Sequence, residues 1–337
     1  MTGSPDLPDV IHLLERAHVV ALPMRVPFRG VDVREAVLFE GPSGWGEFAP
    51  FAEYDDLEGS RWLASAIEAA YAAWPAPRRD AVPVNATVPA VTAREVPAVL
   101  ARFDGCTTAK VKVAERGQSL VDDLDRVASV RDTMGASARI RVDANGGWSL
   151  DQAIEALGKL AAYDLEYAEQ PCTTVDDLAA LRKALARNGV DVRIAADESI
   201  RKAVDPLLVA RREAADLVVV KVAPLGGVVR ALEIVEACGL PAVVSSALDT
   251  SIGIAAGVAL AAALPDLDHA CGLGTVSLFD RDVASRPLRP RGGVLMPGRA
   301  QPDPEALAAL AAPSDRQRWW RERLGRCHAL LVDGVLR

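Results

Sequence analysis

Short apolar runs alternate with longer amphipathic stretches through the middle of the chain. The runs are rich in valine, isoleucine and alanine, and the stretches between them carry apolar residues at helical spacing. Eight runs follow this pattern: residues 82–88, 109–113, 138–143, 165–169, 192–197, 217–221, 242–245 and 269–273. Four of the intervening stretches are long enough to be crossover helices: residues 119–133, 150–162, 175–188 and 228–238. The alternation predicts an α/β fold, and eight strands predict a (β/α)8 barrel of the TIM type.

The first 80 residues show a different pattern, in which strands precede a single long helix. Strands are expected near residues 19–23 and 34–40, and the Gly-Pro-Ser-Gly sequence at 41–44 favours a turn. A helix is expected over residues 57–74, followed by a proline-containing linker at 75–80. This order predicts a separate α+β domain.

Beyond residue 275 the chain becomes rich in proline and arginine, and helices are expected over residues 304–311 and 316–324. We expect this tail to pack back on the N-terminal domain. The predicted organisation is an α+β capping domain at residues 1–80, the barrel at 81–275, and a C-terminal tail at 276–337 that completes the capping domain.

Composition narrows the classes of function. The chain has 337 residues and a formal net charge of −8, with scattered basic residues, which argues against nucleic acid or an anionic membrane as the main partner. The longest uncharged apolar run, residues 252–264, is shorter than the roughly 20 residues that span a bilayer. The N-terminus lacks the features of a secretory signal, so we expect a cytoplasmic protein that binds a small molecule. The sequence does not determine its oligomeric state.

The number and positions of the cysteines and lysines narrow the chemistry that the chain could perform. The five cysteines are far apart and odd in number, which indicates reduced packing residues rather than disulfides or a zinc site. Only six of the 38 basic residues are lysine, and a desolvated lysine can act as a base whereas arginine keeps its proton. Three lysines lie in polar helical sequence, which is typical of solvated residues: Lys159, Lys183 and Lys202. The other three lie in apolar runs and are candidate catalytic residues: Lys110, Lys112 and Lys221.

Three carboxylates and one of these lysines each end a predicted strand. Asp143, Glu169, Asp197 and Lys221 follow one another at intervals of 26, 28 and 24 residues, which is one βα unit each time. Because barrel enzymes have their active sites at the carboxyl ends of the strands, we expect these side chains to lie together. Three carboxylates repel one another unless a cation lies between them. All-oxygen ligation favours Mg²⁺, with Mn²⁺ as the alternative, and the four histidines are too dispersed for a zinc or iron site.

Lys110 and Lys112 lie two residues apart on one predicted strand, so their side chains point to the same face. The helix layer would bury two unpaired ammonium groups, whereas the end of the barrel offers carboxylates. There, the charge of the other lysine and of a dication is expected to lower each pKa towards neutrality, as a general base requires. Lys221, about four strands away around the ring, is expected to face them across a substrate. The alternative is that these lysines merely form ion pairs with the carboxylates.

These residues resemble the motifs of a known family. The resemblance is to the muconate-lactonizing subgroup of the enolase superfamily, and the motifs are Lys110-Val-Lys112, Asp143-Ala-Asn145, Glu169-Gln-Pro171, Asp197-Glu-Ser199 and Lys221. Gly44-Trp-Gly-Glu-Phe-Ala-Pro50 also resembles the active-site loop of that superfamily's capping domain. The resemblance implies that a metal-bound carboxylate acidifies an α-proton, a lysine removes it, and the metal and an opposing lysine hold an enediolate. It also implies Mg²⁺ ligands, namely Asp143, Glu169 and Asp197, supported by Asn145 and Glu198.

Within this subgroup the chain resembles the o-succinylbenzoate synthases. This finer resemblance is carried by the short chain and by two segments, Val26-Pro-Phe-Arg29-Gly30 and Ser245-Ser246-Ala-Leu-Asp-Thr-Ser251. It implies the syn dehydration of a succinyl-hydroxycyclohexadiene carboxylate to o-succinylbenzoate in menaquinone biosynthesis. Lys112 would take the proton α to the ring carboxylate and then help hydroxide leave from the same face. Lys110 would tune Lys112 and contact the metal-bound carboxylate, and Lys221 would stabilise the enediolate from the other face.

Further residues are candidates for substrate binding. Ser245 falls 24 residues after Lys221 and, with Ser246, is expected to line the site, although a core or turn serine is the alternative. Gly226 and Gly227 precede a helical stretch, so their amides could receive a substrate carboxylate or simply form a tight turn. Arg29 could reach an anionic substrate tail, although a solvated arginine is the preferred interpretation.

Other functions are weighed against this one. Within the superfamily they are an N-acylamino acid racemase, a dipeptide epimerase and a cycloisomerase. An epimerase of this subgroup usually has Asp-x-Asp at the eighth strand to hold the substrate ammonium, whereas residues 269–274 read His-Ala-Cys-Gly-Leu-Gly. From another class, the chain could be a non-catalytic, metal-stabilised binding barrel. The retained lysines argue against that alternative, because arginine would suffice to bind anions.

Overall fold

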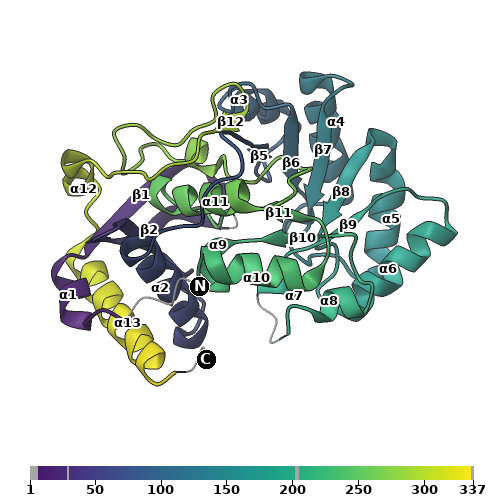
Figure 1. Cartoon of the computed structure of the whole chain (residues 1–337). Helices are drawn as coiled ribbons and strands as arrows, with labels where there is room; N and C mark the ends of the chain where they lie inside the picture. The colour runs from purple at the N-terminus through teal and green to yellow at the C-terminus, as the bar shows by residue number, and fades with distance from the viewer. Residues whose placement is uncertain (1–6, 29, 202–204, 335–337) are drawn as a thin grey trace.

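The computed structural model describes residues 7–28, 30–201 and 205–334, and in it a curled parallel sheet is joined to a capping domain (Figure 1). The strands of this sheet lie side by side in chain order, and every neighbouring pair is parallel. They are β5 (Ala86–Val88), β6 (Thr108–Lys112), β7 (Arg139–Asp143), β8 (Leu165–Glu169), β9 (Ile194–Ala196), β10 (Leu217–Val220) and β11 (Ala242–Val244). The predicted α/β barrel architecture is confirmed.

The eighth position of the barrel is filled without a strand. Cys271 forms a parallel bridge with Val84, and Gly272 forms one with Ser245, so the segment joins β11 to the chain that precedes β5. A Cβ atom at Gly272 would lie 2.5 Å from the Ser245 Oγ, so a side chain at this position would displace the Ser245 hydroxyl. The prediction of a regular strand over residues 269–273 is therefore wrong, although the segment occupies the eighth place.

The first predicted strand, residues 82–88, is also divided. Its beginning is β4 (Val82–Pro83), which pairs with β12 (Val294–Leu295) in a separate antiparallel sheet of two strands, and only β5 enters the barrel. A proline has no amide hydrogen to donate, so Pro83 suits the edge of a small sheet better than the interior of a barrel.

Helices connect the strands and surround the barrel. The four stretches predicted to be helical form α4, α5, α6 and α10, and shorter helices occupy the other connections. The bounds are α3 (Val96–Leu100), α4 (Leu120–Met134), α5 (Leu150–Leu160), α6 (Val175–Arg187), α7 (Glu198–Arg201), α8 (Leu208–Arg211), α9 (Val222–Leu225), α10 (Val228–Cys238) and α11 (Ser251–Ala263), with 3-10 turns η1 (Ala93–Glu95), η2 (Ala161–Tyr163) and η3 (Thr275–Leu278). The apolar run noted in the sequence is α11, which is buried almost all round between barrel and cap. In the described part of the chain, no helix combines the length and the apolarity that a membrane span requires.

The capping domain combines both ends of the chain. Its antiparallel sheet has β1 (His18–Phe28), β2 (Val31–Gly41) and β3 (Gly44–Phe48), and its helices are α1 (Val10–Glu15), α2 (Asp56–Tyr71), α12 (Pro304–Ala309) and α13 (Ser314–Val332). Helix α13 packs beside α2 (Figure 1), which confirms that the tail helps to form the cap. Strand β3 was not predicted, because its residues were interpreted as a loop. The domain boundaries at residues 80 and 275 stay predictions.

Cap and barrel share one hydrophobic core. Phe48 and Trp62 of the cap belong to the same buried cluster as Ile252 of α11 and Val244 of β11. Because apolar burial is continuous across the junction, the cap is fixed over the carboxyl ends of the barrel strands rather than tethered by a linker alone.

Candidate active site

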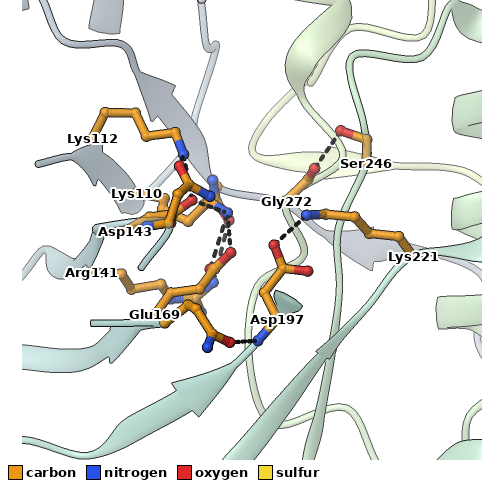
Figure 2. A network of polar contacts seen from close by, with 12 residues as sticks. Lys110, Lys112, Arg141, Asp143, Glu169, Asp197, Lys221, Ser246 and Gly272 are labelled. Atoms are coloured by element: carbon orange, nitrogen blue, oxygen red, sulfur yellow. Dashed lines mark hydrogen bonds and ion pairs between the residues drawn. The ribbon is translucent and has the colours of Figure 1, made fainter. Parts of the chain in front are cut away.

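Six charged side chains gather at the carboxyl end of the barrel, and we call them the strand-end cluster. Two lie on β6, two end β7 and β8, and two directly follow β9 and β10: Lys110, Lys112, Asp143, Glu169, Asp197 and Lys221. All are between 0% and 7% exposed. Figure 2 shows that Lys221 approaches the carboxylates from the side opposite Lys110 and Lys112. The structure therefore brings together all the catalytic and metal-binding candidates that the sequence placed at strand ends.

Strand register sets the ion pairs on one side of the cluster. Lys112, Asp143 and Glu169 are direct neighbours across β6, β7 and β8, so they lie at one level. Lys112 Nζ lies 2.8 Å from Asp143 Oδ2, while Lys110 Nζ lies 2.9 Å from Glu169 Oε1 and 3.3 Å from Asp143 Oδ2. Burial would raise the pKa of Asp143, but Lys112 and Lys110 hold it well below its usual range.

The expected lowering of the lysine pKa assumed a dication beside the lysines, so it stays a prediction. Burial lowers the pKa of Lys110, but the Glu169 and Asp143 carboxylates outweigh burial and hold the pKa above its ordinary value. The expectation placed a dication between the groups, whereas here the ammonium itself is the countercharge. Burial and the negative charge of Asp143 raise the pKa of Glu169 to about 7. The like-charge repulsion that was expected at this site is thus present.

On the opposite side, Asp197 joins a lysine to an arginine. Lys221 Nζ lies 2.5 Å from Asp197 Oδ2, and Arg201 Nε donates to Asp197 Oδ1 over 3.1 Å. Burial would raise the pKa of Asp197, but Lys221 and Arg201 lower it to about 2. Arg201 also donates to the Tyr54 hydroxyl of the cap over 3.1 Å. Arg201 was not predicted, although its place four residues after a candidate carboxylate at a helix start was a usable signal.

Asn145 and Glu198 connect the two sides. The Asn145 side-chain oxygen accepts a hydrogen bond from Lys112 Nζ, and its Nδ2 donates to Glu198 Oε1 over 3.2 Å. Glu198 Oε1 also accepts from Arg201 Nη2 over 2.7 Å. The second oxygen of Glu198, Oε2, is buried and has no hydrogen-bond partner among the described residues. A path of polar contacts therefore runs from Lys112 through Asn145 and Glu198 to Arg201.

Gln170 fixes the segment that carries Asp197, and it too was missed. Its Oε1 accepts from the backbone amides of Asp197 and Ser199, at 2.9 and 3.2 Å, and its Nε2 donates to the Ser199 hydroxyl over 2.7 Å. Gln170 is fully buried and has a left-handed backbone with φ of 38°. Gln170 lies inside the Glu-Gln-Pro motif, so the sequence placed it near the site but did not show which groups it contacts.

The residues at this site fit a divalent cation by their chemistry. Three buried carboxylates on adjacent strands offer only oxygen donors, which suits Mg²⁺ or Mn²⁺. Yet no three His, Cys, Asp or Glu side chains within residues 7–28, 30–201 and 205–334 are arranged so that they could hold a metal ion as they stand. The reason is that Asp143, Glu169 and Asp197 each turn towards a lysine ammonium. Cation binding at these residues would require at least one oxygen of each carboxylate to turn towards the ion, while the other oxygen could keep its contact.

A small cavity, with about 30 Å³ open to the centre of a water molecule and one side partly open to solvent, adjoins the cluster. Its charged lining has three lysines and one carboxylate: Lys110, Lys112, Lys221 and Asp143. The remaining lining is polar or apolar: Phe28, Phe51, Thr87, Asn145, Ser245, Ser246, Ala247, Leu248, Gly272 and Thr275. The Ser246 hydroxyl donates to the Gly272 carbonyl over 2.8 Å and lies 2.8 Å from the Thr275 hydroxyl. The eighth segment thus presents uncharged groups here, and the cavity favours an anionic, partly apolar ligand.

The glycine pair does not offer the amides that were expected. Gly226 N donates to the Ala223 carbonyl and Gly227 N to the Val222 carbonyl, so both amides are engaged in the turn between α9 and α10. The amides of Val228 and Val229 at the start of α10 donate to the carboxylate of Glu68 from the cap. The alternative, a tight turn, is therefore what the structure shows at these glycines, and the start of α10 binds a carboxylate of the protein itself. Arg29 lies outside the described residues.

Comparison with known proteins agrees with this geometry. The family model described as Enolase C-terminal domain-like matches residues 92–302, and the one described as Enolase N-terminal domain-like matches residues 19–70. The o-succinylbenzoate synthase of Mycolicibacterium smegmatis is 60% identical over 98% of this chain and 99% of its own length. The chain belongs to the enolase superfamily and, within it, to the o-succinylbenzoate synthase family. The o-succinylbenzoate synthase of Mycobacterium tuberculosis is 57% identical over 97% of this chain and 98% of its own.

Solved structures of the superfamily share the fold. Muconate lactonizing enzyme from Pseudomonas fluorescens, complexed with muconolactone, superposes with a TM-score of 0.74 at 21% identity, covering 88% of this chain and 98% of that one. The L-Ala-D/L-Glu epimerase from Bacillus subtilis superposes with a TM-score of 0.70 at 25% identity, covering 84% and 96%. These structures show a shared fold, while the predicted resemblance to the enolase superfamily is confirmed by the family models.

Proposed function

We propose that this protein dehydrates succinyl-hydroxycyclohexadiene carboxylate to o-succinylbenzoate in menaquinone biosynthesis. The observation that carries the proposal is the identity of 57–60% to o-succinylbenzoate synthases over nearly the whole of both chains. The cavity supports it, because three lysines face an anionic ligand while Phe28, Phe51 and Leu248 supply apolar walls for a carbocycle.

Lys112 is the proposed base. It removes the proton α to the ring carboxylate, and the electron pair of that C–H bond remains on the substrate. The resulting ammonium then protonates the departing hydroxyl on the same face, so water leaves and the ring becomes aromatic. Asp143 and Asn145 hold the Lys112 Nζ in place, which restricts the amine to one approach.

The other lysines supply charge. Lys221, held by Asp197 on the opposite side, stabilises the negative charge that develops on the substrate carboxylate. Lys110 lies between Glu169 and Asp143, where it maintains the positive potential around Lys112. Asp143, Glu169 and Asp197 are the residues that would hold Mg²⁺, or Mn²⁺ in its place, with Asn145 and Glu198 beside them. When bound, the cation would withdraw electron density from the substrate carboxylate and acidify the α-proton.

The identity of the substrate is tested by comparing competing reactions. A racemase needs Lys221 to exchange its proton with solvent in each turnover, whereas a syn dehydratase needs Lys221 only as a cation. We expect kcat/KM for the cyclohexadiene substrate, followed by ultraviolet absorbance, to exceed that for N-succinyl and N-acetyl amino acids. A preference for the amino acids by more than about tenfold, or about 1.4 kcal/mol of transition-state binding, would replace the assignment with an N-acylamino acid racemase.

A further inference from the structure

We propose that Arg34 and Glu47 of the cap are positioning residues that shape the substrate cavity by holding the loop between β11 and α11. This loop, residues 246–250, is called the site loop below. The identity of the substrate in this inference rests on the proposed function, whereas the contacts of Arg34 and Glu47 with the loop do not depend on it. Two side chains from the cap, a guanidinium group and a carboxyl group, hold the two ends of one barrel loop.

The site loop needs support from its surroundings. Ser246, Ala247 and Leu248 all line the cavity. Leu248 has a φ of 61°, the left-handed backbone region that residues with a Cβ rarely adopt. A strained residue in a cavity wall keeps its position only where neighbouring groups determine it. The groups that do so at this loop come from the cap.

Arg34 on β2 holds the first half of the loop by its carbonyls. The residue is only 3% exposed, and its guanidinium donates to the carbonyls of Leu248 at 3.2 Å and Ala247 at 3.3 Å. The same guanidinium donates to the Ala49 carbonyl and lies 4.4 Å from the centre of the Phe51 ring. Phe51 and Leu248 both line the cavity, so one guanidinium fixes a wall from the cap and a wall from the barrel.

Glu47 on β3 holds the second half by its amides. Its carboxylate accepts from the Thr250 amide at 3.1 Å, from the Thr250 hydroxyl at 2.5 Å, and from the Gly253 amide at 2.9 Å. These groups form the start of α11, where the first backbone amides have no partner within the helix. A Cβ atom at Gly253 would lie 3.0 Å from Glu47 Oε2, so the glycine permits this close approach.

The arrangement predicts an effect on binding rather than on proton transfer. The hydrogen bonds of Arg34 and Glu47 go to the site loop, to the start of α11 and to Ala49, and not to the strand-end cluster. Releasing the loop would therefore move Leu248 and Phe51 while leaving Lys112 and Lys221 on their strands. Loss of a binding wall raises KM and leaves kcat nearly unchanged when the reacting groups are undisturbed.

The test compares Arg34→Met with Arg299→Met. Arg299 makes the same kinds of contact away from the site, since it donates to the carbonyls of Ala69 and Ala72 and lies 4.0 Å from the centre of the Trp74 ring. With the cyclohexadiene substrate, Arg34→Met is expected to raise KM by about tenfold or more and change kcat by less than about threefold. Arg299→Met is expected to leave both unchanged. A fall in kcat at constant KM, or an equal effect of both variants, would overturn the proposal.

A second readout does not depend on turnover. Hydrogen exchange of the amides of residues 246–253, measured in the protein without substrate, is expected to accelerate in Arg34→Met and not in Arg299→Met. Unchanged exchange in Arg34→Met overturns the proposal even if the enzyme acts on another substrate. Glu47→Gln, which retains the side-chain volume, is expected to accelerate exchange most at Thr250 and Gly253. This variant decides the question if Arg34→Met does not fold.

Discussion

Lys112 is held on three sides before any substrate arrives. Its Nζ contacts Asp143 Oδ2 at 2.8 Å and the Asn145 side chain, and it lies 5.3 Å from the centre of the Phe28 ring. A base held this firmly loses little freedom when the reacting atoms meet. Because the same contacts also suit a fixed ammonium group, an experiment has to distinguish Lys112 as a base from Lys112 as a positive charge.

The variant Lys112→Arg makes that separation, because arginine keeps the positive charge but does not give up its proton. We expect kcat to fall by about 10²- to 10⁴-fold, the usual contribution of a general base. Lys159→Arg is the matched control, since within the described part of the chain Lys159 pairs only with the exposed Glu155 one helical turn away. Near-normal turnover of Lys112→Arg would show that the lysine serves only as a charge and would transfer the role of base to Lys110 or Lys221.

For single residues, the sequence predicted where the charged side chains lie in the barrel better than it predicted which groups they contact. The spacing of one βα unit placed Asp143, Glu169, Asp197 and Lys221 correctly at one end of the barrel, because parallel strands begin and end together. Side-chain pairing depends on which oxygen each ammonium reaches in three dimensions, and no spacing encodes that choice. For this reason neither the choice of Glu169 and Asp143 as partners of Lys110 nor the role of Arg201 was predicted.

The segment in the eighth barrel position is held by side chains as well as by its two backbone bridges. Arg141, fully buried below Asp143 on β7, donates to Glu166 Oε2 over 2.5 Å and to the Ala270 carbonyl over 2.6 Å. His269 Nδ1 lies 2.8 Å from Glu166 Oε1. The carboxylate of Glu166 thus joins β7, β8 and the eighth segment.

Replacing Glu166 should therefore destabilise the barrel. In Glu166→Gln the buried Arg141 loses its countercharge, and breaking a buried pair in this way costs about 3–5 kcal/mol in the free energy of unfolding. Glu155→Gln removes the exposed pair with Lys159 and is expected to cost less than about 0.5 kcal/mol. Urea unfolding at neutral pH measures both variants, and equal small losses would contradict the structural role of Glu166.

The effect of Glu166 should also depend on pH. Burial raises the pKa of Glu166, but the hydrogen bonds from His269 and Arg141 outweigh burial and lower it to about 2. A depressed carboxyl pKa stabilises the fold above the unfolded value of about 4.5, and this contribution disappears as the pH falls towards 2. The difference in unfolding free energy between the wild type and Glu166→Gln should accordingly narrow across that range.

The sequence predicted the elements whose apolar residues repeat at regular spacing. It did not predict the elements that depend on pairing with distant parts of the chain. Helices α4, α5, α6 and α10 match the amphipathic stretches, because a helix that buries one face has apolar residues at helical spacing. The eighth segment forms only single bridges to Val84 and Ser245 among the described residues and is therefore no regular strand. Strand β3 was missed because its Gly-Trp-Gly-Glu-Phe sequence is typical of a loop and becomes a strand only through pairing with β2.

Across the whole molecule, the junction of cap and barrel contains a pair of buried carboxylates. Burial and the neighbouring Asp249 raise the pKa of Glu47 to about 8, while Thr250, Arg34 and Gly253 only partly oppose the rise. Between about pH 4.5 and 8 the folded protein therefore retains a proton that the unfolded chain has lost. This contribution to stability is complete below about pH 4.5 and is lost as the pH rises to about 8.

Glu47→Gln cannot ionise, so its stability should lack this dependence on pH. Relative to the variant, the wild type is expected to lose at least about 1 kcal/mol of unfolding free energy between about pH 6 and pH 9. Urea unfolding of both proteins at the two pH values measures the difference, in which the titrations common to both proteins cancel. A constant difference would show that Glu47 is ionised throughout and that Arg34 dominates its environment.

The charges at the carboxyl end of the barrel balance, although the chain as a whole has a net charge of −8. Among the described residues in this network, four cations face four carboxylates: Lys110, Lys112, Lys221 and Arg201 against Asp143, Glu169, Asp197 and Glu198. A divalent cation bound alone would leave an excess of two positive charges in a buried site, and a dicarboxylate bound alone would leave two negative ones. Bound together they restore neutrality, so each should strengthen the binding of the other.

The coupling can be measured with the reaction product, o-succinylbenzoate, which carries two carboxylates. We expect the Kd of Mn²⁺, determined by calorimetry, to fall at least about tenfold when o-succinylbenzoate is saturating, equivalent to about 1.4 kcal/mol of coupling free energy. Because the linkage is reciprocal, Mn²⁺ should lower the Kd of o-succinylbenzoate by the same factor. Benzoate, with a single carboxylate, should give a smaller effect. The contrary result is a Kd of Mn²⁺ that is the same without a ligand, with o-succinylbenzoate and with benzoate. In that case the cation and the dicarboxylate would not share the strand-end cluster, and the metal ligands would have to be sought elsewhere.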